Sequence, residues 1–215
     1  MDALFPAGSC VLDVTAGTGL DVLHLIERGV HVIAADISPH MLAQLKLKAP
    51  GVETRILDFN HLDTVRFTPT LNGIISTFAG LNTSPDLRSF AAAAARLLDR
   101  NAVLFIHILN RWPAREIGGS LIHLKWSEGW SKLTRADRAV ALGDRSIRHY
   151  LYSPVALYRR VFSADFRLQR VEGQGLFTEP AADNRSWLRG WETTLSGRFP
   201  FHSLGTFFSL EMNRR

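Results

Sequence analysis

The chain has a single cysteine and no long hydrophobic run, and each absence excludes a class of protein. Cys10 alone cannot form an internal disulfide or a cysteine-rich metal site, and we expect no metal. No apolar stretch approaches the ~20 residues that a membrane-spanning helix needs. The first residues show no basic segment followed by an apolar core, so we expect no secretory signal. A cytoplasmic protein with no membrane partner fits these observations.

Long runs of one charge are also absent. The formal net charge of +5 is uneven, because residues 1–100 hold 8 Lys and Arg against 10 Asp and Glu, whereas residues 101–215 hold 17 against 10. The basic residues are scattered, without the runs that are typical of nucleic-acid-binding arms. We therefore do not expect nucleic acid as the partner, although the basic second half also suits an acidic substrate or a polyanion.

The length and composition are those of one globular domain. Hydrophobic residues make up 46% of the 215 residues and charged residues 21%. A chain of this length can bury one core but is short for two. No internal repeat and no Pro/Gly/Ser-rich linker divides it. We expect a single domain over residues 1–215, with an irregular insertion on the substrate side at about 112–150.

Apolar, β-branched runs alternate with helix-like segments through the first half of the chain. The pattern predicts strands at 11–14, 30–36, 52–57, 72–78 and 101–109, and helices at 20–28, 39–48 and 86–98. Such alternation requires parallel pairing through right-handed crossovers and is typical of a doubly wound α/β sheet. The second half is less regular. It predicts strands at 146–152, 166–173 and 206–212, and helices from 153 to about 162 and at 183–196.

The polar residues at the strand ends are the candidates for chemistry. Gly17 and Gly19 turn the first strand into a tight loop that opens a helix, and glycine lets a ligand lie against the backbone. Each of the first five predicted strands has a polar residue near its carboxyl end. Asp13 lies late in the first strand, and the other four lie at or just after the ends of strands two to five: Asp36, Asp58, Thr77 and Asn110. Ligands bind beyond the carboxyl ends of parallel strands, so we expect these side chains to converge on one crevice.

The loop argues against a dinucleotide. Only two glycines of a G-x-G-x-x-G pattern are present, and Asp21 follows near the place of the third. Asp13 would repel a pyrophosphate, whereas a carboxylate suits a cationic ligand or the ammonium group of an amino acid. Asp36, at the end of the second strand, suits the hydroxyls of a ribose. The two acids together indicate a nucleoside joined to an amino acid.

Four segments in order carry a family resemblance. They are VLDVTAGTG at 11–19, VIAADIS at 32–38, ILDF at 56–59 and NGIISTFAGLN at 72–82. They resemble the first motif, the second strand with its ribose-binding acid, the segment whose Asp contacts the adenine amine, and the fourth strand of the class I S-adenosylmethionine-dependent methyltransferases. The match covers about residues 10–110, and residues 166–171 and 205–210 resemble strands six and seven of that family.

The resemblance implies a Rossmann-like doubly wound seven-stranded sheet, mostly parallel, with an antiparallel last strand inserted between strands five and six. It also implies S-adenosylmethionine as cofactor. Thr15 stands where the family usually has the first glycine of the loop, which is tolerable at ordinary φ. The implied cofactor residues are Asp13, Ala16, Gly17 and Gly19 at the amino-acid end, Asp36 at the ribose and Asp58 with Phe59 at the adenine, together with Thr18, Ile37, Thr77 and Phe78.

The candidate catalytic residues lie in and after the fifth strand. The methyl of a sulfonium is already activated, so the protein must align a nucleophile, exclude water and, for a hydroxyl or an acid, supply a base. His107 is either that base or a satisfied histidine in the sheet. Asn110 and Arg111 follow the strand, and Arg111 either holds a substrate carboxylate or forms a surface salt bridge. Four tryptophans either line an aromatic pocket or pack under a helical cap: Trp126, Trp130, Trp187 and Trp191.

Other branches of the family lack their signatures in this chain. The Asn/Asp-Pro-Pro-Tyr/Phe signature of N-methylation on bases and glutamine is replaced by STFA at 76–79. Thr77 cannot replace the acidic ligand of metal-dependent transfer, and no cysteine pair supports methylation of rRNA at C5. We expect methyl transfer to an O or N atom of a small, acidic or aromatic molecule, by a monomer or homodimer. An RNA or protein methyltransferase and a non-catalytic cofactor-binding domain are the alternatives.

Overall fold

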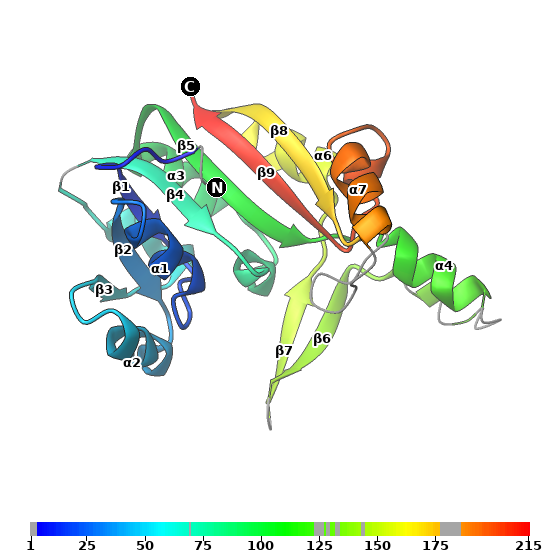
Figure 1. Ribbon diagram of the computed structural model, residues 1–215, viewed down its shortest axis with the longest axis horizontal. Coiled ribbons are helices and arrows are strands. Elements are labelled where there is room, and N and C mark those ends of the chain that lie inside the picture. Colours follow the sequence, from blue (N-terminus) through cyan, green and yellow to red (C-terminus); the bar gives the residue numbers. More distant parts are fainter. Residues whose placement is uncertain are drawn as a thin grey trace.

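The computed structural model describes residues 4–68, 70–122, 127, 130–131, 134–142, 145–176 and 186–215. Seven strands form one sheet in the order β3-β2-β1-β4-β5-β9-β8 (Figure 1). The strands are β1 (Cys10–Asp13), β2 (His31–Asp36), β3 (Glu53–Ile56), β4 (Leu71–Ser76), β5 (Leu98–Leu109), β8 (Phe166–Gln174) and β9 (Phe207–Arg214).

The strand directions confirm the predicted Rossmann-like topology. The first five strands are parallel, with Val11 of β1 level with Val32 of β2 and Gly73 of β4. The last strand, β9, runs antiparallel to both β5 and β8, with Leu104 level with Met212. It therefore lies between the fifth and sixth strands of the sheet. The order reverses at β1, where β2 lies on one side and β4 on the other, so this is the switch point at which ligands bind.

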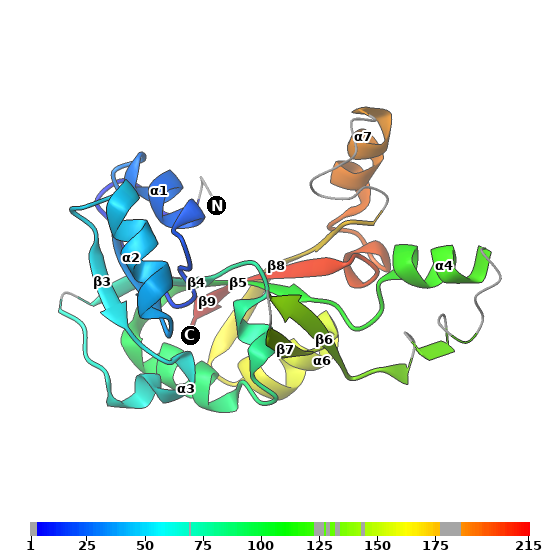
Figure 2. The same ribbon diagram turned by 90° about the horizontal axis from the view of Figure 1, so that it is seen from below.

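Helices cover both faces of the sheet (Figure 2). On one face lie α1 (Leu20–Ile26) and α2 (Pro39–Lys48), and on the other lie α3 (Arg88–Leu97) and α6 (Pro154–Leu157), which continues as the π-helical turn η3 (Tyr158–Phe162). Helix α2 begins as the sequence predicts, because Ser38 Oγ accepts the N–H of Met41 and Pro39 takes the first helical position. Short 3-10 turns complete the chain at η1 (Phe59–Thr64), η2 (Gly80–Thr83) and η4 (Phe201–Ser203).

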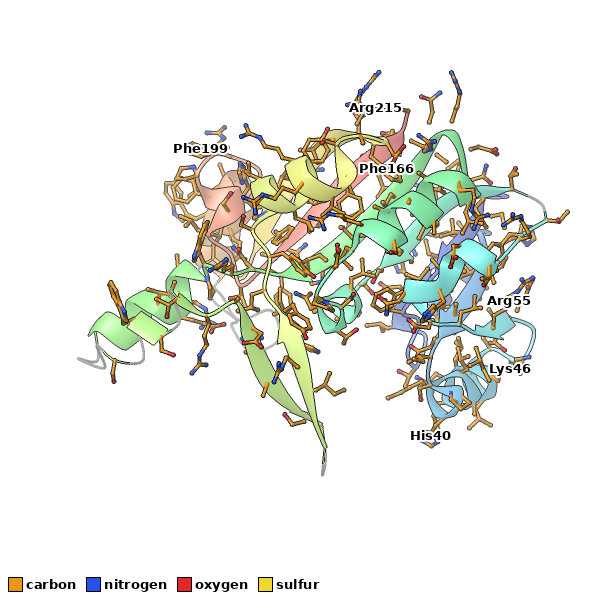
Figure 3. All side chains as sticks on the ribbon, turned by 180° about the vertical axis from the view of Figure 1, so that it is seen from behind. His40, Lys46, Arg55, Phe166, Phe199 and Arg215 are labelled. Atoms are coloured by element: carbon orange, nitrogen blue, oxygen red, sulfur yellow. The ribbon has the colours of Figure 1, made fainter. Side chains whose placement is uncertain are left out.

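The larger core lies between the sheet and α3, η3. Alanines give α3 a narrow surface that lets it approach the sheet closely. Four phenylalanines from α3, η3 and the last two strands of the sheet are fully buried there: Phe90, Phe162, Phe166 and Phe208. Each buries ~150–250 Å², so they dominate the stability of this half. Figure 3 shows this layer from behind, with Phe166 labelled, while the side chains of His40, Lys46 and Arg55 point outward at the other end.

The insertion is more ordered than the sequence indicates. After β5 come α4 (Ala114–Ile122) and a separate antiparallel hairpin of β6 (Asp137–Leu142) and β7 (Arg145–Tyr150), and α7 (Ser186–Leu195) follows β8. The predicted strand at 146–152 corresponds to β7. The partner β6 was not predicted, because its residues fell in a segment read as irregular. The sequence predicts a helix plus an irregular insertion up to about residue 141, and the structure adds the strand β6 to this segment.

Candidate cofactor and acceptor site

The loop after β1 is fastened to the end of β2 by one carboxylate. Asp36 Oδ2 accepts the N–H of Gly17 at 2.8 Å, and Asp36 Oδ1 accepts the N–H of Ser38 at 2.8 Å. The backbone adds a further bond, from Ala16 N to Ala35 O at 2.9 Å. Asp36 thus fixes two loops at the switch point and retains lone pairs that can accept hydroxyl groups.

The two loop glycines serve different purposes. Gly17 has φ +52°, and a Cβ placed there would meet no atom within 4 Å, so its backbone faces open space. Gly19 has φ +86°, and its Cβ would lie 2.2 Å from Leu45 Cδ1, so its missing side chain makes room for α2. Between them, exposed Thr18 offers its carbonyl to Lys48 Nζ at 2.9 Å. Gly17 is therefore the position at which a ligand can approach the backbone.

Thr15 fits the loop because a glycine faces it from η2, the turn that follows β4. Its hydroxyl lies 2.8 Å from Ser76 Oγ, and a Cβ on Gly80 would lie 2.5 Å from Thr15 Cβ. The non-glycine residues with positive φ in the described part of the chain are Phe78, Ala79 and Asn101, so Thr15 has an ordinary backbone. The departure from the family pattern at Thr15 is matched by the space at Gly80.

Three carboxylates gather at the carboxyl ends of β1 and β2. Asp13 is 1% exposed, and burial raises its pKa to about 8, with the charges of Asp21 and Asp36 raising it further against the opposing N–H of Thr15. Asp21, in the first turn of α1, accepts the hydroxyl proton of Thr77 from the end of β4. A cation would relieve this repulsion, whereas a phosphate would add to it. The electrostatics favour a positively charged ligand.

Strain and exposed apolar groups mark the same place. Phe78 and Ala79, directly after β4, have φ of 49° and 62°, a left-handed conformation that costs ~1–3 kcal/mol per residue and clusters at functional sites. Three large apolar side chains next to the loops of the site are exposed. The exposed fractions of Leu20, Ile37 and Phe78 are 66%, 67% and 65%. Exposed apolar side chains of this kind suit the flat faces of a ligand.

His107 lies beside this group, on β5. Its ring stacks on Phe207 at 4.8 Å between centroids and meets Phe78 edge-on at 6.4 Å. Its buried Nε2 has no hydrogen-bond partner. Burial lowers the pKa of His107 to about 4, against the opposing charge of Asp21 and a hydrogen bond with Gln174. The imidazole is therefore neutral at pH 7 and has a nitrogen available.

Comparison with known proteins finds a family match in the first half of the chain. Residues 11–101 match the model of the methyltransferase domain family. The whole chain has the fold of S-adenosylmethionine-dependent methyltransferases. Comparison with curated proteins found no match.

Solved methyltransferases share the fold of this chain across nearly its whole length. A SAM-dependent methyltransferase from Methanosarcina mazei is 12% identical at TM-score 0.68, covering 99% of this chain and 95% of its own. The DhpI-SAM-HEP complex is 19% identical at TM-score 0.58, covering 95% and 78%. A Haloferax volcanii chain in complex with the Trm112 methyltransferase activator is 15% identical at TM-score 0.61, covering 98% and 83%.

The pKa of His107 predicts a pH-dependent stability for the methyltransferase. The folded chain keeps His107 neutral, while the unfolded chain binds a proton near pH 6.5, so this stability is present above pH 6.5 and is lost as the pH falls toward 4. Between pH 7 and 5, we expect the free energy of unfolding of the wild type to fall by about 2 kcal/mol more than that of His107→Asn. Urea unfolding measures this difference, and parallel profiles would contradict it.

Two predicted site residues also make structural contacts. Asn110 is 2% exposed, and its amide donates to Ser203 O at 2.7 Å and Gly205 O at 2.8 Å. Phe59 is buried in the larger core, where it packs edge-on against Phe90 at 6.1 Å. Asn110 therefore holds the chain before β9 and Phe59 holds η1 on α3.

Asp58 is held by its own turn. Its carboxylate accepts the N–H of Asn60 at 2.9 Å and lies 3.0 Å from His61 Nδ1. Burial raises the pKa of Asp58, but the bonds from Asn60 and the nearby His61 outweigh it, so the pKa is below its usual range. Leu57 N donates to Asp36 O at 3.1 Å, which sets this turn beside the ribose candidate.

Two of the four tryptophans that suit an aromatic pocket or packing under a helical cap lie outside the described side chains. Trp126 and the side chain of Trp187 are not described, and Trp130 and Trp191 are 70% and 59% exposed. Two hollows lie at the amino ends of the strands instead. One of about 480 Å³ includes Asn101, and one of about 880 Å³ lies between α1 and α2. Neither includes a predicted site residue.

The described residues contain neither a candidate membrane span nor a candidate metal site. Within them, no helix is long and apolar enough to cross a membrane. In the same part of the chain, no three His, Cys, Asp or Glu side chains are grouped so that they could hold a metal ion.

Proposed function

We propose that this methyltransferase transfers a methyl group to an O or N atom of a small organic molecule, within one domain of residues 1–215. The observation that carries the proposal is His107, a neutral histidine with a buried and unpartnered Nε2 beside the carboxylates of the cofactor site. Hydroxyl and amine acceptors lose a proton on methylation, and a positioned imidazole can take it.

The residues at the switch point fit S-adenosylmethionine. Asp36 offers acceptor lone pairs to ribose hydroxyls, Gly17 offers open space above its backbone, and exposed Ile37 offers an apolar surface. The carboxylate of Asp21 suits a positive charge of the cofactor, and a bound cation would also oppose the raised pKa of the nearby Asp13. When bound, this cofactor supplies an electrophilic methyl group. We include Asp58 at the adenine, because its turn adjoins Asp36.

The acceptor side is built for orientation rather than for strong activation. Phe78 and Phe207 bracket His107, so an acceptor placed against Nε2 would lie between aromatic faces that exclude water. The left-handed turn at Phe78 and Ala79 aims the phenyl ring away from the core. The DhpI-SAM-HEP complex has a similar fold and contains both SAM and HEP. It supports an arrangement in this chain in which the cofactor and a second ligand are adjacent.

Methyl transfer to a panel of small hydroxy- and amino-compounds tests the proposal. We expect turnover with at least one member, and we expect His107→Asn to lower kcat by ~10²–10⁴-fold, the usual range for loss of a general base. His40→Asn, an exposed histidine of α2, is the matched control and should keep wild-type turnover. Turnover with no small acceptor, or an unchanged kcat for His107→Asn, would refute the assignment.

A macromolecular acceptor is the second candidate. The excess of 17 Lys and Arg over 10 Asp and Glu in residues 101–215 favours it, and the Haloferax volcanii chain assembles with a methyltransferase activator. An RNA acceptor predicts an affinity that falls steeply with salt. Titration of an RNA oligonucleotide at several salt concentrations decides between the two, and we expect no salt-dependent binding. We expect the chain to act as a monomer or homodimer.

A further inference from the structure

The hairpin of β6 and β7 and the helix α4 both leave the sheet at the carboxyl end of β5 (Figure 1). Arg111 N donates to Tyr152 O at 2.8 Å, and Tyr152 N donates to Leu109 O at 3.4 Å. Since β7 ends at Tyr150, the base of the hairpin is fixed against the residues that follow β5. The hairpin therefore borders the acceptor side of the proposed active site.

One face of this hairpin carries basic side chains. Arg138 of β6 lies directly opposite His149 of β7, so their Cβ atoms are about 5 Å apart. Arg138 Nη1 lies 3.8 Å from Glu116 Oε1, which joins the hairpin to α4. His149 precedes Tyr152 by three residues, or about 10 Å of extended chain. Arg111, Arg138 and His149 therefore all belong to the base of the hairpin or to the chain fixed against it, and we call this set the basic corner.

The basic corner contains buried polar atoms that bind nothing. Arg111 Nε, Arg138 Nε and His149 Nδ1 are each buried without a hydrogen-bond partner. Buried polar atoms are almost always paired, so three unpaired ones in one corner require an explanation. Glu116 lies near Arg138, but its carboxylate approaches Nη1 of that side chain and leaves Nε without a hydrogen bond. The corner therefore has surplus positive charge and free nitrogen atoms.

We propose that the basic corner binds an oxyanion, a carboxylate or a phosphate-type group, carried by the small acceptor molecule. Arginine suits this task, because its planar fork matches both kinds of anion. Arg111 lies four residues beyond His107, about 13 Å along extended chain. An acceptor with its nucleophile at His107 and its anion in the corner would span this gap. The inference rests on the proposed function and adds an anionic substrate class to it.

The burial of the three nitrogen atoms favours a small anion over a nucleic acid. A phosphate backbone binds exposed arginines along a surface, whereas these atoms are recessed. The opposite face of the hairpin provides a contrast. Arg148 on that face is 69% exposed and lies 3.4 Å from Asp137, so its charge is already compensated.

Binding of inorganic phosphate to the purified full chain tests the inference. We expect saturable binding in calorimetry at constant ionic strength, with two-dimensional NMR shifts confined to a few arginine Nε signals. Arg111→Gln and Arg138→Gln should each weaken binding at least about tenfold, because each removes a charge-assisted hydrogen bond. Arg148→Gln is the matched control and should bind as the wild type does, with thermal melting confirming that all three variants fold.

Several outcomes would overturn the inference. Phosphate that shows no saturable binding to the wild type would do so, as would equal weakening by Arg148→Gln, which would indicate general charge attraction. Tighter binding of a single-stranded oligonucleotide than of phosphate, lost in Arg138→Gln, would also overturn it in favour of a nucleic-acid surface. Benzoate and phenylphosphonate, used as competitors, then show which anion the corner prefers.

The test also separates this inference from the proposed function. S-adenosylhomocysteine binding, measured on the same variants, should be unchanged, because the basic corner lies beyond the cofactor residues. If the wild type fails to bind S-adenosylhomocysteine but binds phosphate at Arg138, the proposed function fails and the anion site stands. For an anionic acceptor that turns over, Arg138→Gln should raise KM at least about tenfold with little change in kcat, the result of lost uniform binding.

Discussion

Asp36→Ala is expected to weaken S-adenosylhomocysteine binding at least about 100-fold. The carboxylate accepts the N–H groups of Gly17 and Ser38 at 2.8 Å each, and bonds of this charged kind contribute ~1.5–3 kcal/mol. Its removal releases both loops and also takes away the acceptor for the ribose hydroxyls. A loss of about 3 kcal/mol corresponds to a factor of about 100 in Kd, which calorimetry measures directly.

The control for Asp36→Ala is a carboxylate of the same kind outside the site. Asp63 in η1 is exposed, so Asp63→Ala should bind S-adenosylhomocysteine as the wild type does. Asp36→Asn adds a second comparison, because it keeps the shape but replaces one acceptor oxygen by a donor. Wild-type affinity in Asp36→Ala would contradict the assignment of Asp36 to the cofactor, provided that thermal melting shows a folded variant.

Gly80→Ala is expected to lower the free energy of unfolding by about 2–3 kcal/mol, the usual cost of overpacking in a core. The added Cβ would lie 2.5 Å from both Cβ and Cγ2 of Thr15, and Thr15 is held by Ser76 at 2.8 Å. The loop that carries Gly17 must then shift, so S-adenosylhomocysteine affinity should also fall. Urea unfolding and calorimetry on one preparation measure both effects.

Thr15→Gly should rescue Gly80→Ala. The glycine removes the collision, although it also removes the bond to Ser76, so we expect the double-mutant cycle to show a coupling of ~1–3 kcal/mol between the two positions. Gly51→Ala is the neutral control, because its Cβ would meet nothing within 4 Å and its φ is ordinary. Simple additivity would show that Thr15 and Gly80 do not compensate for each other.

The order of the sheet and the positions of Asp13 and Asp36 at its strand ends could be predicted because they depend on local signals. Apolar runs that end in Asp13 and Asp36 are short, contiguous patterns, and the parallel order follows from the crossovers between them. The bond from Asp36 to Gly17 joins neighbouring strands of that order. Ser38 and Pro39 gave the start of α2 in the same way.

The acceptor half depends on contacts between distant residues, which no window of sequence contains. His107 stacks on Phe207, and Asn110 bonds the carbonyls of Ser203 and Gly205, some hundred residues later. The sequence therefore could not separate a catalytic from a structural residue there. Arg138 and His149 lie opposite each other because of the pairing of β6 with β7. The sequence does not predict β6, so it could not predict this pair.

The interior position of β9 has a consequence for how the enzyme is made. The strand latest in the sequence lies between β5 and β8, so both neighbours have an unpaired edge until Phe207–Arg214 has been synthesised. Such edges are prone to aggregation, and pairing over so long a separation is slow. Synthesis must therefore pass Phe207, a hundred residues after His107, before the two rings can meet. The acceptor side is completed last, after the cofactor half has had time to fold.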